Sequence, residues 1–588
     1  GEELYRGLKG KRYLIVMDDI EAWNDLKKYF PNDNNKSRIL FTSRITNVAL
    51  HVKPDRPPHP LRFLTEDESW ELLKQKIFRT EVCPPVLEKI GKQIVRKCGG
   101  LPLAIVVVAG LLAKTDKMQD WWEQVTQSVS SHSIIGNAEQ CMNTLALSYG
   151  HLPNHLKACF LYFGAFPEDY EIRVWKLIRL WIAEGFIHQI GQKSLEDVAG
   201  EYLMDLIDRS LVLVAKKKST GEIKACRIHD LLHDFCLTKM CIPLDNVSTT
   251  LHIRSFLWFA YDHQSPSHDF LTFRHLRVLD LLAIWIPEFS HGITQLFLLR
   301  YLALRGEHLA IPDSISNLHN LETLIVSDGI GTTIPPNIWK IVKLRHLRIG
   351  GINYMEAPNF EDGYPLALDN LQTITQIEPS ASCESVLART PNLRKLGFCG
   401  HFNRVMGCFW FPDLDFLNQL ETLWLLNKPT PRINNLQRVK FPPHLKRLLL
   451  SHTRLEWEEM SIIGMLPNLE ALKLEYNACI GPSWETNDGG FRRLKFLRFY
   501  LMNIKQWSAS SSQFPSLQRL ELGRCEKLKE IPSELGDIST LQTIEVSWCS
   551  QSATNSARRI REEQKSMGND WLQISILRTL DSGLATYS

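Results

Sequence analysis

Two adjacent carboxylates near the start of the chain have the position needed for phosphate chemistry. Asp18 and Asp19 directly follow the apolar run Leu14–Met17, and a buried parallel strand delivers the side chains at its end to the edge of a sheet. This arrangement is typical of one half of a nucleotide site. The other half is a glycine-rich loop whose backbone amides and lysine hold the phosphates. The chain contains no Gly-x-x-x-x-Gly-Lys-Ser/Thr sequence, so we predict that this polypeptide, as given, binds nucleotide poorly and cannot hydrolyse it.

A second group of residues has the chemistry of zinc ligands but not the geometry. Its members are Cys226, His229, His233 and Cys236. On one helix, ten residues span about 15 Å, whereas zinc ligands lie about 2.0 to 2.3 Å from a single metal. The four side chains cannot all meet at one ion in a helix, so we interpret them as part of a helix face.

The second half of the chain contains an internal repeat. The pattern Leu-x-x-Leu-x-Leu or a close variant occurs twelve times, at intervals of 22 to 27 residues. This is the period of leucine-rich repeats, in which each coil supplies one short strand and the leucines stack into a continuous core. The copies begin at residues 276, 299, 321, 344, 371, 393, 420, 445, 469, 494, 517 and 541. The copy at 371 is the weakest, because Gln376 is expected in its last apolar position.

The exposed positions of these predicted strands are mostly basic or neutral. A solenoid offers a long recognition surface and seldom does chemistry, so the repeats favour binding over catalysis. The basic side chains predict a surface for an acidic partner, and a solvated polar face is the alternative that the sequence leaves open. The predicted recognition face consists of Arg277, Arg300, Arg345, Arg394, Lys446 and Arg447; His346, Lys395, Lys473 and Lys495 extend the same basic side.

Helices are predicted between the acidic strand and the repeats. Thr65 and Glu68 form a capping box at the start of one helix. Gly99 and Gly100 end a second, and Pro102 is placed for the first turn of a third. That third segment, Leu101–Ala113, is too short to cross a bilayer and carries no basic signal-peptide flank, so it predicts a buried helix.

The next segment predicts a winged-helix module. Residues 147–186 have the pattern of amphipathic helices broken at Pro153 and Pro167, and residues 196–212 add another helix. Residues 211–230 predict a two-stranded ribbon that turns at Gly221, after which His229 and Asp230 open a last helix. No concentrated basic recognition helix is present, so we interpret the module as a packing domain rather than a DNA-binding one.

Composition sets broad limits on function. The chain has 68 Lys and Arg against 65 Asp and Glu, so its net charge does not point to nucleic acid as a partner. Its 13 cysteines are odd in number and have no paired spacing, which predicts free thiols in a reducing compartment, the cytoplasm or the nucleus. Residue 1 is Gly rather than Met, and we expect the chain to be N-terminally incomplete.

Taken in order, the motifs resemble those of plant nucleotide-binding leucine-rich-repeat disease-resistance proteins of the coiled-coil class. "RYLIVMDDI" resembles the Walker B strand of that family, "SRILFTSR" the next strand with its sensor Arg44, and "CGGLPLA" the GLPLA turn. "CFLYFGAFPEDYEI" and "LIRLWIAEGF" are similar to signatures of the coiled-coil class. "RIHD" stands in the place of the MHD motif, with Ile228 where Met is usual. The resemblance covers essentially the whole chain.

The resemblance implies a multidomain α/β protein and five regions. These are the C-terminal part of a nucleotide-binding α/β domain at 1–60, a helical bundle at 61–135, a winged-helix domain at 136–250, a leucine-rich-repeat solenoid at 251–550 and a capping segment at 551–588. The capping segment is expected to be a polar helix through 556–574 that closes the solenoid.

The resemblance also implies roles for single residues in the complete protein, which would bind ADP or ATP with Mg²⁺. Asp18 would hold the Mg²⁺ and Asp19 would polarise the attacking water. Arg44 would sense the terminal phosphate, and Pro102 would pack against adenine. His229 would bind the β-phosphate of ADP and keep the protein closed, and the switch residue Asp230 would fix the start of the helix that carries it.

The function implied is that of an intracellular immune receptor rather than an enzyme. Its repeats would recognise a pathogen effector or a guarded host protein and would also contact the helical domains of the same chain. Self-association and membrane association are expected only after activation. The alternative is a truncated or decoy interaction scaffold without nucleotide switching. A metal-dependent NTPase needs the missing phosphate loop and ranks last.

Overall fold

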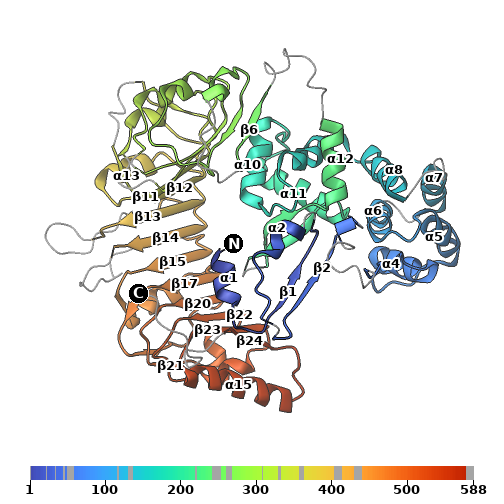
Figure 1. Cartoon of the computed structure of the whole chain (residues 1–588). Coiled ribbons are helices and arrows are strands. Elements are labelled where there is room, and N and C mark those ends of the chain that lie inside the picture. Colours follow the sequence, from blue (N-terminus) through green and yellow to red (C-terminus); the bar gives the residue numbers. More distant parts are fainter. Residues whose placement is uncertain are drawn as a thin grey trace. The chain divides into compact units, whose positions relative to one another are not determined.

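The computed structural model divides the chain into two compact units. One unit comprises residues 1–106 and 117–141, and the other comprises residues 107–116 and 142–588. Figure 1 shows the whole chain. The structure describes residues 2–20, 23–33, 35–43, 45, 47–48, 58–114, 118–129, 137–218, 221–240, 253–259, 268–307, 309–328, 333–356, 363–402, 413–428 and 440–577.

A two-stranded parallel sheet carries the acidic pair. Strand β1 (Leu14–Met17) pairs with strand β2 (Arg38–Phe41), with Leu14 opposite Arg38 and Met17 opposite Phe41. The same region contains helices α1 (Glu2–Leu8) and α2 (Trp23–Lys27). The expectation that β1 is buried was wrong. Leu14 and Val16 are 69% and 66% exposed, because they share one face of the strand and no described element covers that face.

Three helices of the first unit pack around aromatic side chains. Thr65 and Glu68 form the predicted capping box at the start of the first of them. A Cβ at Gly91 would lie 2.2 Å from the ring of Trp70, so only glycine permits this approach of two helices. The helices are α4 (Glu66–Phe78), α5 (Pro85–Lys97) and α7 (Gln119–Val129), with α5 in contact with both others.

The second unit begins with helices and a small antiparallel sheet in the order β3–β5–β4. The predicted ribbon is confirmed as β4 and β5, and the short β3 adds a third strand that the sequence did not predict. The elements are α9 (Asn154–Leu161), β3 (Ile172–Arg173), α10 (Val174–Glu184), α11 (Leu195–Asp208), β4 (Leu213–Lys217), β5 (Ile223–Arg227) and α12 (Asp230–Met240). Helices α6 (Pro102–Ala113) and α8 (Asn137–Gly150) each continue from one unit into the other.

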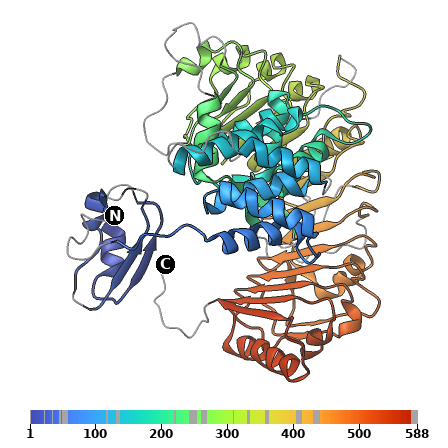
Figure 2. The same cartoon turned by 90° about the vertical axis from the view of Figure 1, so that its right-hand side faces the viewer.

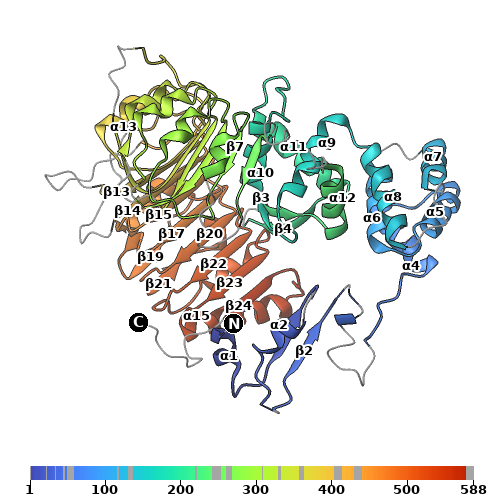
Figure 3. The ribbon, with the colours of Figure 1, turned by 45° about the horizontal axis from the view of Figure 1, so that its top comes forward.

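The repeats form one sheet of parallel strands, which Figures 1 and 3 show as a regular stack. Each of the twelve predicted copies contains a strand that begins two residues after its first leucine or equivalent position. These strands are β7 (Val278–Asp280), β8 (Tyr301–Arg305), β9 (Thr323–Ser327), β11 (His346–Met355), β12 (Thr373–Ile377), β13 (Lys395–Gly400), β14 (Thr422–Asn427), β15 (Arg447–Ser451), β17 (Ala471–Glu475), β20 (Phe496–Tyr500), β22 (Arg519–Gly523) and β23 (Thr543–Ser547).

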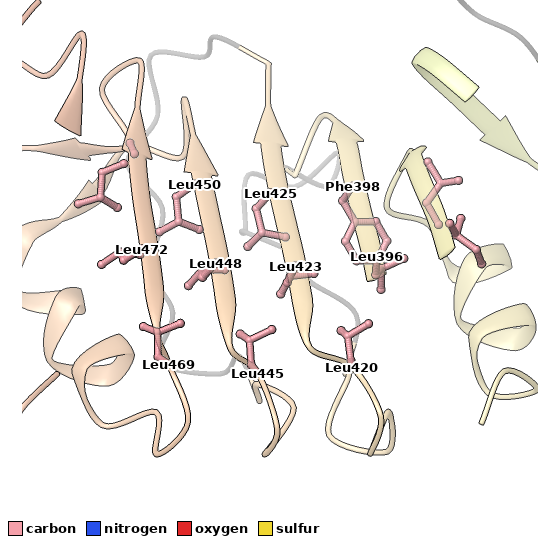
Figure 4. Packing of buried hydrophobic residues seen from close by; sticks show 14 of the residues in the cluster. Leu396, Phe398, Leu420, Leu423, Leu425, Leu445, Leu448, Leu450, Leu469 and Leu472 are labelled. Atoms are coloured by element: carbon pink, nitrogen blue, oxygen red, sulfur yellow. The ribbon is translucent and has the colours of Figure 1, made fainter. Parts of the chain in front are cut away.

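The repeat leucines stack from coil to coil. In Figure 4, Leu420, Leu445 and Leu469 occupy equivalent positions in three successive coils, and all three are at most 1% exposed. On the side of the returns, Trp484 stacks between Trp457 and Trp507, with ring centroids 5.1 and 5.7 Å away. Because each coil buries its apolar side chains only against its neighbours, the stability of the sheet is shared along the stack.

The structure corrects two details of the repeat prediction. In β12, a register shift places Gln376 in the left-handed region with φ of 62°, and Ile377 becomes the buried residue. Near the C-terminus, the polar helix α15 ends at Ser566 rather than continuing to Ile574. The chain then forms β24 (Gln573–Leu577), which pairs with β23 and extends the sheet. A further strand, β6 (Ser255–Leu257), pairs with β7 at the other end.

Figure 2 shows the bundle helices and the repeat sheet from the side. Within the described ranges, no helix combines the length and apolar character needed to span a bilayer.

Candidate functional site

The predicted magnesium-binding carboxylate is accessible and held in place by the neighbouring strand. Asp18 is exposed at the end of β1, and its Oδ1 accepts a hydrogen bond from Thr42 Oγ1. The backbone N–H of Asp19 donates to the same hydroxyl, 2.9 Å away. These residues fit the acidic side of a metal site, which needs carboxylate oxygens. They supply none of the amides or ammonium groups that bind phosphate. Arg44 lies outside the described residues.

Pro102 occupies the first position of α6, as predicted. The preceding Gly99 and Gly100 have positive φ angles of 61° and 72°, which suit glycine at the end of a helix. A Cβ at Gly100 would lie 2.3 Å from the backbone oxygen of Leu64. The turn is therefore tightly built around glycine, and the contact of Pro102 with a nucleotide stays a prediction.

His229 and Asp230 lie at the start of α12 in the second unit. The His229 side chain is exposed, and its Nδ1 accepts a hydrogen bond from the backbone N–H of Leu231 at 3.3 Å. Asp230 is the first residue of the helix, where a carboxylate interacts favourably with the helix dipole. The structure places this pair in one unit and Asp18, Asp19 and Pro102 in the other.

The four zinc-like side chains do not form one cluster. Cys226 Sγ donates to the carbonyl of Ile172 at 3.8 Å, and Cys236 Sγ donates to the carbonyl of Phe160 at 3.5 Å. His233 Nε2 lies 2.7 Å from the carbonyl oxygen of Phe166. Burial raises the pKa of both thiols to about 12, so they remain protonated at neutral pH.

The basic repeat residues have acidic partners on the winged-helix domain. The central contact is made by Glu196, in the first turn of α11. Arg345 Nε and Nη2 donate to its two carboxylate oxygens at 2.8 and 2.5 Å. His346 Nε2 and Gln372 Nε2 lie 3.0 and 2.9 Å from the same carboxylate. A carboxylate held by four nitrogen atoms is a strong, charge-assisted contact.

Other contacts join the same two parts of the second unit. Asp197 Oδ2 lies 3.3 Å from Arg394 Nη1, and Glu222 forms an ion pair with Arg447. Arg277 Nη1 donates to the backbone carbonyl of Glu184 at 2.7 Å. In the opposite sense, Lys176 Nζ of α10 lies 2.6 Å from Asp280 Oδ2 of β7. The contacts therefore extend from β7 to β15 across the repeats.

The remaining two members of the predicted recognition face pair within the solenoid. Arg300 Nη1 lies 3.8 Å from Glu322 Oε1, and Lys446 Nζ lies 2.7 Å from Glu421 Oε1. These contacts link neighbouring coils. The structure thus assigns four of the six predicted basic residues to the winged-helix side and two to the repeats themselves, and recognition of an external partner by any of them stays a prediction.

Burial makes this contact region electrostatically sensitive. Burial alone would raise the pKa of Glu196, but the hydrogen bonds from His346 and Arg345 outweigh it and hold that pKa well below its usual range. Burial, reinforced by the charge of Arg179, lowers the pKa of His346 to about 3, so this imidazole is neutral. Burial also lowers the pKa of Lys395 to about 8. A substitution that adds or removes a charge beside these buried groups should therefore change the stability of the contact.

An aromatic side chain joins the two parts as well. The Trp175 ring of α10 contacts two guanidinium groups, with its centroid 5.0 Å from that of Arg179 and 4.8 Å from that of Arg348 on β11. Cation–π contacts of this kind strengthen when they are desolvated.

Sequence reasoning missed the acidic half of this site. Glu196 and Asp197 follow the helix-capping Ser194, so their pattern is already explained by helix capping. Glu222 lies beside the turn of the ribbon. The sequence does show an acidic helix start and a basic strand face, which match in charge. That match does not indicate which acidic residue pairs with which basic one.

Comparison with known proteins shows which families the successive regions of the chain resemble. Three family models match in order: the NB-ARC domain at residues 1–83, the disease resistance protein winged helix domain at 165–236 and a leucine-rich repeat region at 252–402. A late blight resistance protein homologue of Solanum demissum, R1B-16, is 36% identical over 95% of this chain and 47% of its own length. A second, R1B-23, is 38% identical over 95% of this chain and 48% of its own length.

Among solved structures, a leucine-rich-repeat protein of Leptospira interrogans is 20% identical, covers 53% of this chain and 86% of that chain, and has a TM-score of 0.30. The chain spans about half the length of the curated relatives it matches. A nucleotide-binding, a winged-helix and a repeat region in this order, together with those relatives, mean that the chain belongs to the plant NB-ARC leucine-rich-repeat disease-resistance proteins.

Proposed function

We propose that this chain forms the regulatory and recognition part of an intracellular plant immune receptor. The winged-helix domain is held on the basic strand face of the repeats while the receptor is inactive. A pathogen effector or a guarded host protein that binds the repeats releases it. Such a ligand acts by binding the released state more tightly than the held state, which every ligand-driven switch requires.

The contact of Glu196 with Arg345 supports this proposal most directly. The side chains of Glu196 and Arg345 are only 18% and 12% exposed, so separation of the two domains leaves both charges without their partner and returns them to water. Two arrangements, one with these hydrogen bonds formed and one with the domains apart, would give the receptor the two states that a switch needs.

Nucleotide binding is a property of the NB-ARC family to which the first region is matched. In the complete receptor, we propose that exchange of ADP for ATP biases the same equilibrium, with Asp18 toward Mg²⁺ and His229 toward the β-phosphate. When bound, the metal ion would supply charge neutralisation of the phosphates. The residues of this chain contribute the acidic side of that site, and tight binding would depend on a phosphate loop that this sequence lacks.

Charge reversal in a complete receptor that carries this chain tests the proposal. Glu196→Lys and Arg345→Glu should each cause signalling without a pathogen, measured as ion leakage from leaf tissue that expresses the receptor. The double variant should be quieter than either single variant, because it restores an opposite-charge pair. Glu201→Lys is the matched control, since Glu201 lies on the same helix and its one ion pair among the described residues is with the exposed Lys193. Quiescence of both single variants would overturn the proposal.

A further inference from the structure

The C-terminal coils repeat an unusual backbone feature. In five successive coils, the residue immediately after the strand has a positive φ between 50° and 55°. Glycine adopts this conformation without cost, whereas other residues are strained there. None of the five positions is glycine, and all carry large side chains: His452, Tyr476, Leu501, Arg524 and Trp548. We call these five residues the left-handed column.

The column is a ridge of partly exposed, largely aromatic side chains. Tyr476 is 40% exposed and Trp548 38%. The His452 ring stacks on Tyr476 with centroids 5.0 Å apart and an interplanar angle of 9°, and Tyr500 meets the same tyrosine edge-on at 5.6 Å. Burial lowers the pKa of His452, so the imidazole adds a neutral aromatic wall rather than a cation.

A pocket of about 220 Å³ opens beside the column. Its lining includes His452, Tyr476, Leu501 and Arg524 of the column, together with Asn477. Sites for whole small molecules usually occupy about 300 to 1,000 Å³. The pocket is therefore too small for a cofactor and suits one side chain that protrudes from a larger partner.

Two polar groups of the lining have no partner among the described residues. The Asn477 side-chain oxygen is buried without a hydrogen-bond donor, and such an acceptor gains from an N–H group. The Arg524 guanidinium is exposed and forms no ion pair or hydrogen bond with any described residue, including Glu526, whose carboxylate also lines the pocket. By contrast, neighbouring Arg498 and Arg519 are both paired with Glu521. An occupant should therefore bring a backbone or side-chain N–H and a carboxylate.

We propose that the left-handed column and its pocket bind an extended segment of a partner polypeptide, which inserts one apolar or aromatic side chain between Tyr476 and Leu501 and places a carboxylate on Arg524. The length is suitable. Adjacent strands lie about 4.8 Å apart, so the column spans about 19 Å, the length of about six extended residues. The assignment rests on the proposed receptor function and specifies the partner surface of the repeats.

Selection from a random hexapeptide library tests the site without knowledge of the natural partner. The library is displayed on phage and panned against the full chain and against the full-chain variant Arg524→Glu. The wild-type chain should enrich peptides that combine an aromatic or large apolar residue with Asp or Glu. The Arg524→Glu variant should enrich Lys or Arg in place of the acidic residue. No enrichment, or the same acidic preference in both chains, would overturn the proposal.

Affinity measurements on the selected peptides provide the quantitative test. Fluorescence anisotropy should show that Tyr476→Ala and Arg524→Glu each raise the Kd by at least about tenfold, as expected for anchoring contacts. Phe416→Ala is the control for Tyr476, because Phe416 is equally exposed at 40%. Arg558→Glu on α15 controls for the change of charge. Equal loss of affinity in a control variant would also overturn the site.

Failure here is distinguishable from failure of the proposed function. If the charge-reversal variants at Glu196 and Arg345 signal as expected but no peptide binds the column, only this site is wrong. If the peptides bind as predicted but both charge-reversal variants stay quiescent, the repeats have a binding site and the proposed switch is wrong.

Discussion

Removal of the charge of Glu196 should open the contact between α11 and the repeats. Glu196→Gln keeps the shape of the side chain but replaces the carboxylate that faces Arg345, His346 and Gln372. Loss of one partner of a buried ion pair costs about 3–5 kcal/mol. Because glutamine retains a neutral acceptor, we expect the lower end, about 3 kcal/mol. This corresponds to a change of about 150-fold in the equilibrium between held and released domains.

Amide hydrogen exchange in the first turn of α11 measures this change. At the start of α11, the N–H groups of Asp197 and Val198 donate to Ser194, and this turn opens more readily once its contact with the repeats is lost. Residue-resolved exchange should show a fall in protection of up to about two orders of magnitude at these two amides. Glu201→Gln, on the exposed face of the same helix, should change protection less than threefold, since exposed pairs contribute little.

A double-mutant cycle checks that the effect belongs to the pair. Arg345→Met should also reduce protection, and its effect should be much smaller in the Glu196→Gln background, because the two side chains form one contact. Protection within threefold of wild type in Glu196→Gln would refute the assignment of a stabilising role to this carboxylate. Additive effects of the two substitutions would show that they act through separate contacts.

Four further predictions concern other parts of the chain. In a complete receptor, Asp230→Val should weaken retention of ADP and cause signalling without a ligand; unchanged quiescence would remove the assigned role. Equilibrium dialysis should detect only weak binding of labelled ADP to this chain, and micromolar affinity would contradict that. Lys395→Met should stabilise the chain by about 1–2 kcal/mol at neutral pH, since burial disfavours the ammonium form of the lysine. The pKa of Lys395 in the folded protein is about 8, below the ordinary 10.5. Melting curves should therefore show the full increase in stability below pH 8 and none above pH 10.5. Trp484→Ala should cost about 3–5 kcal/mol in thermal unfolding, because it empties a site between two stacked rings; the exposed Trp285→Ala should leave the melting temperature unchanged.

The repeat strands were predictable because their signal is local. Every copy places its first apolar residue two positions before a strand, and the spacing of the leucines alone defines which side chains are buried. The two outermost strands, β6 and β24, were missed because neither contains the repeated leucine pattern. Gln376 was misplaced for a related reason: a bulge of one extra residue moves Ile377 into the core, and periodicity cannot indicate where such a bulge lies.

The site was predictable only in part. The basic side chains of the strand face follow from the alternation of buried and exposed positions. Their acidic partners do not, because Glu196 lies 149 positions from Arg345 along the chain and its local environment resembles that of any helix start. The prediction that β1 is buried was wrong for a different reason. An apolar run predicted burial, but burial needs a covering element, and composition does not supply one.

The two surfaces of the repeats meet on one strand. Arg447 at the start of β15 pairs with Glu222 of the winged-helix ribbon, and His452 follows the last residue of the same strand. The two residues are five positions apart, about 17 Å along an extended chain. A bulky partner bound at the left-handed column would therefore collide with the ribbon that carries Glu222. It would bind more tightly once the ribbon has moved away. That difference in affinity is what a switch requires. By reciprocity, a partner bound at the column should weaken the Glu222 contact by the same factor by which release of the ribbon strengthens binding at the column.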